Sequence, residues 1–305
     1  MRIYIAGAGG MLGDAFIRRF KEAHEIKCSD LHPSIDIEYC DFRDHREYGR
    51  QVSDWKPDFL FHLGAHTDLE YCERNPDDAY LTNTLSVESA VQIANTMGIP
   101  LLYISTAGIF DGSKDFYDDW DSPNPLGVYA RTKFLGERYV VENAHRYFVC
   151  RAGWMMGGGM QKDKKFIMKL AAQIRDGRRE LNVVTDKLGT PTYTHDFAAN
   201  VAALLHTEFY GVYNMACEGA TSRFEVAQEF LRLLELRQDV RLNPVDSSFF
   251  KRDYFAPRPD SERLVNRKLA LRRLNIMRDW KICLAEYLRE SYSGLTPSQG
   301  TIRGA

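Results

Sequence analysis

A glycine-rich loop near the N-terminus constrains the fold of this 305-residue chain more than any other feature. Gly7, Gly10 and Gly13 follow an apolar run at residues 2–6, and apolar residues spaced four apart follow them. Glycine allows a tight turn, a close approach of backbone N–H groups to a pyrophosphate, and close packing of a helix on a strand. The spacing is G-x-x-G-x-x-G rather than G-x-G-x-x-G, and its strand–loop–helix context predicts a dinucleotide site.

Other residues complete this predicted cofactor site. Met11 and Leu12 open the helix, whose N-terminal N–H groups favour a bound pyrophosphate. Asp30 ends the second predicted strand, where a carboxylate accepts hydrogen bonds from ribose hydroxyls and repels a 2′-phosphate. NAD(H) is therefore favoured, while NADP(H) remains possible because His32 is near. Asp41, after the third strand, is interpreted either as an acceptor for the adenine amino group or as a loop or helix-capping carboxylate.

The chain as a whole predicts an α/β fold, a Rossmann-like doubly wound parallel sheet with a smaller C-terminal substrate lobe. Several predicted strands are almost continuously apolar, which is typical of strands buried on both faces. The predicted strands are 2–6, 25–29, 37–40, 59–65, 101–106 and 147–151. The predicted helices include 77–97, 166–175, 194–205, 222–236 and 280–292.

The order of these elements also predicts the domains. We expect a dinucleotide-binding domain at 1–153, completed by about 190–215, and a substrate lobe at 154–189 and 216–292. Residues 293–305 are polar and glycine-rich, so we expect a flexible tail.

Composition narrows the classes of partner. The 40 Lys plus Arg nearly balance the 42 Asp plus Glu, so neither a nucleic acid nor a membrane is expected as a partner. No apolar stretch reaches the roughly 18 residues that a membrane span needs, and no leader pattern precedes the first strand. The cysteines lack the spacing of metal ligands, so we expect reduced thiols, no metal and a cytoplasmic protein. They are Cys28, Cys40, Cys72, Cys150, Cys217 and Cys283.

A tyrosine and a lysine supply the candidate chemistry. Tyr129 and Lys133 stand four residues apart, on one face of a helix, and Thr106 ends the fifth predicted strand. An ammonium about 4 Å from a phenol is worth roughly 4 kcal/mol at an effective dielectric constant near 20, which would lower the phenol pKa towards 7. We therefore interpret Tyr129 as an acid–base group, Lys133 as its partner and holder of the nicotinamide ribose, and Thr106 as the group that orients the substrate oxygen.

These motifs resemble those of the extended short-chain dehydrogenase/reductases, and within that family those of the dTDP-4-dehydrorhamnose reductases. The resemblance extends from Met1 to about Tyr292. Its matching segments are the glycine loop, 64–67 with Glu70 and Glu73, Asn83 with 86–88, 103–106, Tyr129 with Lys133, Arg151 with Trp154, 189–192, and Arg258 with Pro259.

The resemblance implies a 4-keto nucleotide sugar between the lobes and a catalytic trio of Thr106, Tyr129 and Lys133. It also implies that Ala65 and Thr84 border the cofactor. Further residues are expected to bind substrate: Trp154 by packing on the sugar, Arg258 by contacting a diphosphate, Ala107 beside the catalytic threonine, and His66. For His66, a hydrogen-bonded structural role is the alternative.

The sequence departs from the family after the catalytic threonine. Ala107 and Gly108 stand where the reductases continue Asp-Tyr, so the sugar pocket is expected to differ. The 4,6-dehydratases need Asp-Glu there, so dehydratase activity is disfavoured. Ala15 stands where the family's magnesium-bridged dimer has an acid; a homodimer remains possible.

The prediction is an NAD(H)-dependent reductase of a nucleotide-activated 4-keto-6-deoxysugar, in which Tyr129 donates the proton. The alternatives are an NAD-dependent sugar-nucleotide 4-epimerase and a dinucleotide-binding regulatory subunit without catalytic activity.

Overall fold

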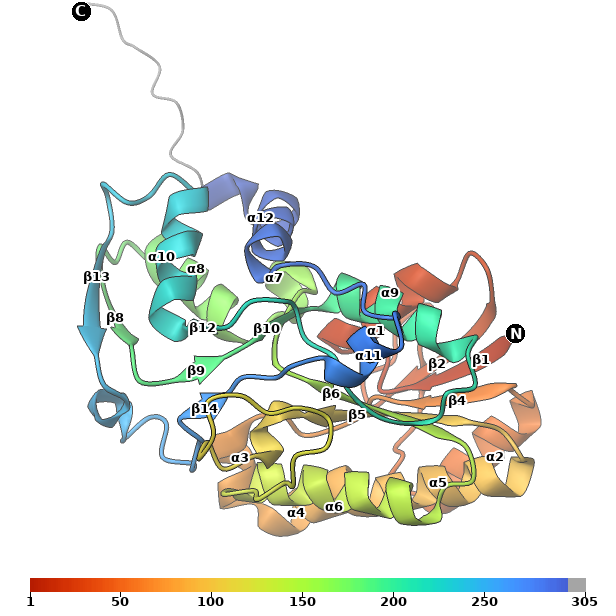
Figure 1. Ribbon diagram of the computed structural model, residues 1–305. Helices are drawn as coiled ribbons and strands as arrows, with labels where there is room; N and C mark the ends of the chain where they lie inside the picture. Colours follow the sequence, from red (N-terminus) through yellow and green to blue (C-terminus); the bar gives the residue numbers. More distant parts are fainter. Residues whose placement is uncertain (296–305) are drawn as a thin grey trace, which may run out of the picture.

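A seven-stranded parallel sheet forms the centre of the computed structural model, which describes residues 1–295 (Figure 1). The strand order is β11-β6-β5-β4-β1-β2-β3. Its strands are β1 (Arg2–Ala6), β2 (Glu25–Asp30), β3 (Glu38–Tyr39), β4 (Phe59–His62), β5 (Leu101–Thr106), β6 (Tyr147–Ala152) and β11 (Gly211–Asn214). The order reverses between β1 and β4, the point at which ligands bind in sheets of this type. The predicted α/β doubly wound fold is confirmed.

Helices cover both faces of the sheet, as its continuously apolar strands require (Figure 1). The helices α1 (Met11–Phe20) and α9 (Thr194–Leu205) share one hydrophobic cluster with the strands. The opposite face holds α2 (His45–Trp55), α5 (Ser86–Met97) and α6 (Val128–Asn143). A second cluster packs α2, α5 and α6 against the strands of that face.

The remaining strands and helices after β6 form a smaller lobe beside the sheet (Figure 1). Its strands are β7 (Trp154–Met156), β8 (Glu180–Val184), β9 (Leu188–Gly189), β10 (Pro191–Tyr193), β12 (Thr221–Ser222), β13 (Arg241–Val245) and β14 (Ser261–Glu262). Its helices are α7 (Gly159–Lys162), α8 (Phe166–Arg175), α10 (Arg223–Leu233) and α12 (Trp280–Ser291). Phe16 of α1 and Phe230 of α10 belong to the same buried cluster, so this lobe has no separate core.

Shorter elements connect these layers. They are α3 (Leu69–Arg74), α4 (Pro76–Tyr80), the π-helical turn η1 (Leu81–Leu85), α11 (Arg267–Leu271) and the 3₁₀ turns η2 (Ala107–Ile109), η3 (Ser247–Phe250) and η4 (Ser293–Leu295). The helix predicted at 77–97 is therefore three elements, with a π turn at its centre. Such turns are rare in proteins, and those that occur are often found at functional sites.

Other predicted boundaries also shift. The strand predicted at 59–65 ends at His62, and the helix predicted at 222–236 ends at Leu233. In the tail predicted at 293–305, the first three residues form η4, and 296–305 lie outside the described residues. The six cysteines are buried and free. Among residues 1–295, no helix is both long and apolar enough to span a bilayer.

A buried ion pair attaches α6 to the sheet. The Arg151 side chain at the end of β6 donates from Nη2 to Glu137 Oε1 of α6 at 2.5 Å. The two side chains are only 5% and 4% exposed. The attraction is strong in this environment because little water screens it, but either charge alone would be costly there.

We predict that Glu137→Ala lowers the free energy of unfolding by about 3–5 kcal/mol, because it leaves a buried guanidinium without its partner. The measurement is urea denaturation followed by circular dichroism. The matched control is Glu142→Ala on the same helix, since Glu142 and Arg138 form a pair that is 58% and 57% exposed. The control should change the free energy by about 0–1 kcal/mol. Equal effects of the two substitutions would contradict this account.

Candidate active site

The glycine loop joins β1 to α1 at the reversal point of the sheet. Gly7 has φ +82°, and a Cβ there would lie 2.4 Å from the backbone nitrogen of Gly64. A Cβ on Gly13 would lie 2.2 Å from the carbonyl oxygen of Ala8. Both positions therefore require glycine, the first for its conformation and both for close packing. Around Gly10, in contrast, the nearest atom is 3.9 Å from a Cβ position, which leaves the loop open on one side.

Asp30 lies beside this loop, at the carboxyl end of β2. Its Oδ2 accepts a hydrogen bond from Gly9 N at 3.0 Å, and its Oδ1 accepts one from His32 N at 3.0 Å. The backbone thus fixes a carboxylate next to the helix N-terminus formed by Met11 and Leu12. An open glycine loop, a helix N-terminus and a fixed carboxylate fit a dinucleotide, with pyrophosphate at the loop and ribose at Asp30.

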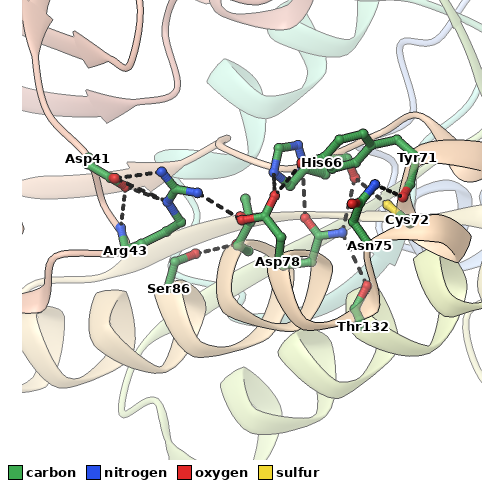
Figure 2. A network of polar contacts seen from close by, with 11 residues as sticks. Asp41, Arg43, His66, Tyr71, Cys72, Asn75, Asp78, Ser86 and Thr132 are labelled. Carbon is green, nitrogen blue, oxygen red and sulfur yellow. Dashed lines mark hydrogen bonds and ion pairs between the residues drawn. The ribbon is translucent and has the colours of Figure 1, made fainter.

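Asp41 is engaged by an arginine that the sequence analysis did not single out. Figure 2 shows Arg43 between two carboxylates, with Nη2 2.7 Å from Asp41 Oδ2 and Nη1 2.9 Å from Asp78 Oδ1. The hydrogen bonds from Arg43 hold the pKa of Asp41 below its ordinary value. Asp41 also accepts from the Arg43 backbone nitrogen at 3.0 Å. These contacts fit the interpretation of Asp41 as a loop carboxylate, while a contact with adenine stays a prediction.

His66 belongs to the same polar network (Figure 2). Its Nε2 lies 2.7 Å from Asp78 Oδ2. Asn83, in the π turn η1, accepts from the His66 backbone nitrogen at 2.8 Å and donates to the His66 carbonyl at 3.0 Å. The backbone of His66 is hydrogen-bonded to Asn83 and its ring lies beside the Asp78 carboxylate, which fits the structural role, and a contact of His66 with substrate stays a prediction.

The π turn also contacts α6, the helix of the tyrosine and lysine. The Thr84 hydroxyl donates to the Thr132 carbonyl at 2.9 Å, and the Asn83 amide donates to the Thr132 hydroxyl at 3.2 Å. Thr84 is buried beside α6, whereas Ala65 is half-buried after β4, at the carboxyl edge of the sheet. The contacts of both residues with a cofactor stay predictions.

Thr106 and Tyr129 lie close together where β5 ends beside α6, and Lys133 follows Tyr129 one turn further along α6. Thr106 is the last residue of β5, and its Oγ1 accepts from Gly108 N at 3.1 Å. The Tyr129 side chain lies close enough to Thr106 for that residue to lower the pKa of the phenol in part. Lys133 Nζ lies 4.2 Å from the ring centroid of Tyr103, which directs the ammonium over an aromatic face. A phenol, a hydroxyl and an amine are thus assembled at the carboxyl edge of the sheet.

Burial shifts the pKa of Tyr129 in the direction opposite to the one predicted from its spacing to Lys133. It raises the pKa of Tyr129 to about 12, and the neighbouring Thr106 lowers it only in part. It also lowers the pKa of Lys133 to about 7, against an opposing effect of Glu137. The expected fall of the Tyr129 pKa towards 7 is therefore wrong for this arrangement, because loss of water around the phenol outweighs other effects. Tyr129 is protonated at neutral pH.

The residues predicted to bind substrate have protein partners. Trp154 Nε1 donates to Glu262 Oε2 at 2.7 Å, and the Arg223 guanidinium lies 3.6 Å from the Trp154 ring centroid. Arg258 Nη2 lies 2.7 Å from Glu70 Oε1, so it joins the second lobe to α3. Ala107 is buried directly after Thr106. Their substrate contacts stay predictions.

Sequence reasoning missed Glu262 and Arg223, because neither belongs to a motif of the cofactor or catalytic segments. Only the pairing of short strands in the second lobe brings them to Trp154: β9 pairs with both β12 and β14. Arg43 was missed for a similar reason, since its second partner, Asp78, is 35 residues away in the sequence.

Comparisons with known proteins agree with this arrangement. The family described as the RmlD substrate binding domain matches residues 1–293. The dTDP-4-dehydrorhamnose reductase of Mycobacterium tuberculosis is 31% identical over 297 residues, which cover 94% of this chain and 92% of that protein. The enzyme of the same name from Salmonella typhimurium is 27% identical over 310 residues, with coverage of 97% and 100%.

Solved structures that are similar to this chain include further dTDP-4-dehydrorhamnose reductases. The crystal structure of a dTDP-4-dehydrorhamnose reductase from Clostridium acetobutylicum matches with a TM-score of 0.86 and 30% identity, over 95% of this chain and 99% of that one. The enzyme of the same name from Bacillus anthracis, in complex with NADP, matches with a TM-score of 0.86 and 26% identity, over 95% and 99%.

These matches support a nicotinamide dinucleotide as the cofactor and confirm the predicted oxidoreductase class. The family match extends over nearly the whole chain. The chain belongs to the RmlD substrate binding domain family, within the extended short-chain dehydrogenase/reductases.

Proposed function

We propose that the protein reduces the 4-keto group of a nucleotide-activated 4-keto-6-deoxysugar, as the names of its relatives suggest, with NAD(H) preferred as cofactor. One observation carries the proposal: the side chain of Tyr129 lies beside Thr106 at the carboxyl edge of β5. A proton donor and an orienting hydroxyl are both needed beside a carbonyl that becomes an alcohol.

Separate residues would bind the cofactor, position the substrate and donate the proton. Asp30 and the glycine loop would hold the dinucleotide, which when bound supplies the hydride. Thr106 would fix the carbonyl oxygen by a hydrogen bond. Tyr129, which is protonated at neutral pH because its pKa is about 12, would give its proton to that oxygen as negative charge develops there.

Lys133 would assist this proton transfer and hold the nicotinamide ribose. Its pKa of about 7 means that charged and neutral forms are both populated near neutral pH. The charged form would stabilise the phenolate that Tyr129 becomes after donation. The opposing effect of Glu137, which raises the Lys133 pKa, helps to maintain that charge.

The preference for NAD(H) is supported by two features. Asp30 presents a carboxylate where the adenosine ribose is expected, and a 2′-phosphate would be repelled there. Arg43, at the same edge of the sheet, is held by Asp41 and Asp78 rather than left available to a phosphate.

We predict that Tyr129→Phe lowers kcat for reduction of a dTDP-4-keto-6-deoxysugar by about 10²- to 10⁴-fold, because the substitution removes the proton donor. The dissociation constant for NADH, measured by fluorescence titration, should change little. The control is Tyr139→Phe on the same helix, which should keep full activity. Undiminished turnover by Tyr129→Phe would refute the assigned role, and no turnover by the unaltered protein with any dTDP-, GDP- or UDP-4-keto sugar would refute the proposed function.

We predict that Asp30→Asn raises the ratio of kcat/KM for NADPH to that for NADH by about 10- to 100-fold, because it removes the negative charge opposed to a 2′-phosphate. Steady-state kinetics with both cofactors measures the ratio. Asp36→Asn, which alters an exposed carboxylate in the segment after β2, should leave the ratio unchanged. An unchanged ratio in Asp30→Asn would show that Asp30 does not set the preference.

A further inference from the structure

The second lobe brings an additional carboxylate to the catalytic edge of the sheet. Strand β14 pairs with β9 so that Glu262 lies opposite Gly189. A Cβ on Gly189 would lie 2.2 Å from Cε2 of Trp154, so only glycine lets the indole ring pack there. The ring in turn donates from Nε1 to Glu262 Oε2 at 2.7 Å. The position of Glu262 is therefore fixed by strand pairing and by a hydrogen bond.

The second oxygen of this carboxylate lies near Gly108, two residues after the catalytic threonine. A Cβ built on Gly108 would lie 3.3 Å from Glu262 Oε1 and 3.5 Å from Thr106 Oγ1. Glu262 Oε1 and the Thr106 hydroxyl oxygen thus both lie next to the position that a side chain on Gly108 would occupy. Among residues 1–295, no group donates a hydrogen bond to Oε1, so this acceptor remains available to a ligand.

The charge of Glu262 is compensated without occupying Oε1. The Arg223 guanidinium lies 3.6 Å from the Trp154 ring centroid, and it attracts the Glu262 carboxylate. Its contact with Glu262 is electrostatic, with no hydrogen bond between them among the described residues. Hydrogen bonds to a carboxylate acceptor are stronger than those to a neutral one.

We infer that Glu262 is a specificity-determining residue that accepts a hydrogen bond from the C3 hydroxyl of the sugar. This inference rests on the proposed function. Thr106 would hold the oxygen of the C4 carbonyl, and in a 4-keto-6-deoxyhexose the only hydroxyl on a carbon next to C4 is that of C3. The protein would therefore select nucleotide sugars that keep this hydroxyl over those that lack it.

The test compares dTDP-4-keto-6-deoxyglucose with its 3-deoxy analogue. The unaltered protein should favour the parent compound by about 10- to 100-fold in kcat/KM. Glu262→Gln can keep an oxygen toward Trp154 while its NH₂ group replaces the acceptor at Oε1. It should reduce the preference for the parent compound to within about threefold. The control is Glu180→Gln, an exposed carboxylate of the same lobe.

Binding measured by calorimetry with NAD⁺ present gives a second readout that does not need turnover. The affinity difference between the two sugars should be about 10- to 100-fold in the unaltered protein and be lost in Glu262→Gln. If it is lost although neither sugar is reduced, the proposed reduction fails and the role of Glu262 stands. If Glu262→Gln keeps the full preference in both measurements, or the unaltered protein shows none, the inference is overturned. Tryptophan fluorescence checks that Trp154 remains packed.

Discussion

The site depends on two places where backbone meets backbone without a side chain between. Gly7 lies against Gly64, and Gly13 lies against Ala8, at distances that no Cβ would permit. These contacts bring α1 onto β1 and β4 at the reversal of the strand order, so that the helix N-terminus points at the ligand edge. The position of Asp30 follows from them, because its carboxylate is bonded to the loop itself.

Helix α6 carries most of the chemistry, and its environment determines what each residue can do. Four residues of this helix make different contacts. Tyr129 lies beside Thr106, and Thr132 is hydrogen-bonded to the π turn. Lys133 lies over the ring of Tyr103, and Glu137 forms an ion pair with Arg151. The side chain of Lys133 is buried, and Tyr129 is partly buried. Burial then makes Tyr129 a proton carrier at neutral pH and brings the Lys133 pKa near 7.

Sequence reasoning succeeded where the signal was local. The glycine loop, the buried strands and the Tyr129–Lys133 spacing each depend on neighbours in the chain, and the structure has the loop, the strands and the spacing as expected. The predicted fall of the Tyr129 pKa was wrong, because the prediction considered the distance to a positive charge and not the loss of water around the phenol. The π turn was also missed, since its apolar spacing resembles that of an ordinary helix.

Sequence reasoning could not find contacts made by distant segments. Glu262 reaches Trp154 across 108 residues, and Arg258 reaches Glu70 across 188. Such contacts depend on the register of two-residue strands such as β9 and β14, which carry too few residues for a pattern to appear.

The hydrophobic cluster that Phe16 and Phe230 share has a mechanical consequence. One continuous hydrophobic cluster extends from the face of the sheet into the smaller lobe. Moving the two parts of the molecule away from each other would expose the apolar residues between them to water, which is unfavourable. Admission of a ligand should therefore rely on rearrangement of peripheral segments around a stiff body. A rigid frame of this kind holds the reacting groups in position before the substrate binds. Less entropy is then lost in orienting these groups when the reaction takes place.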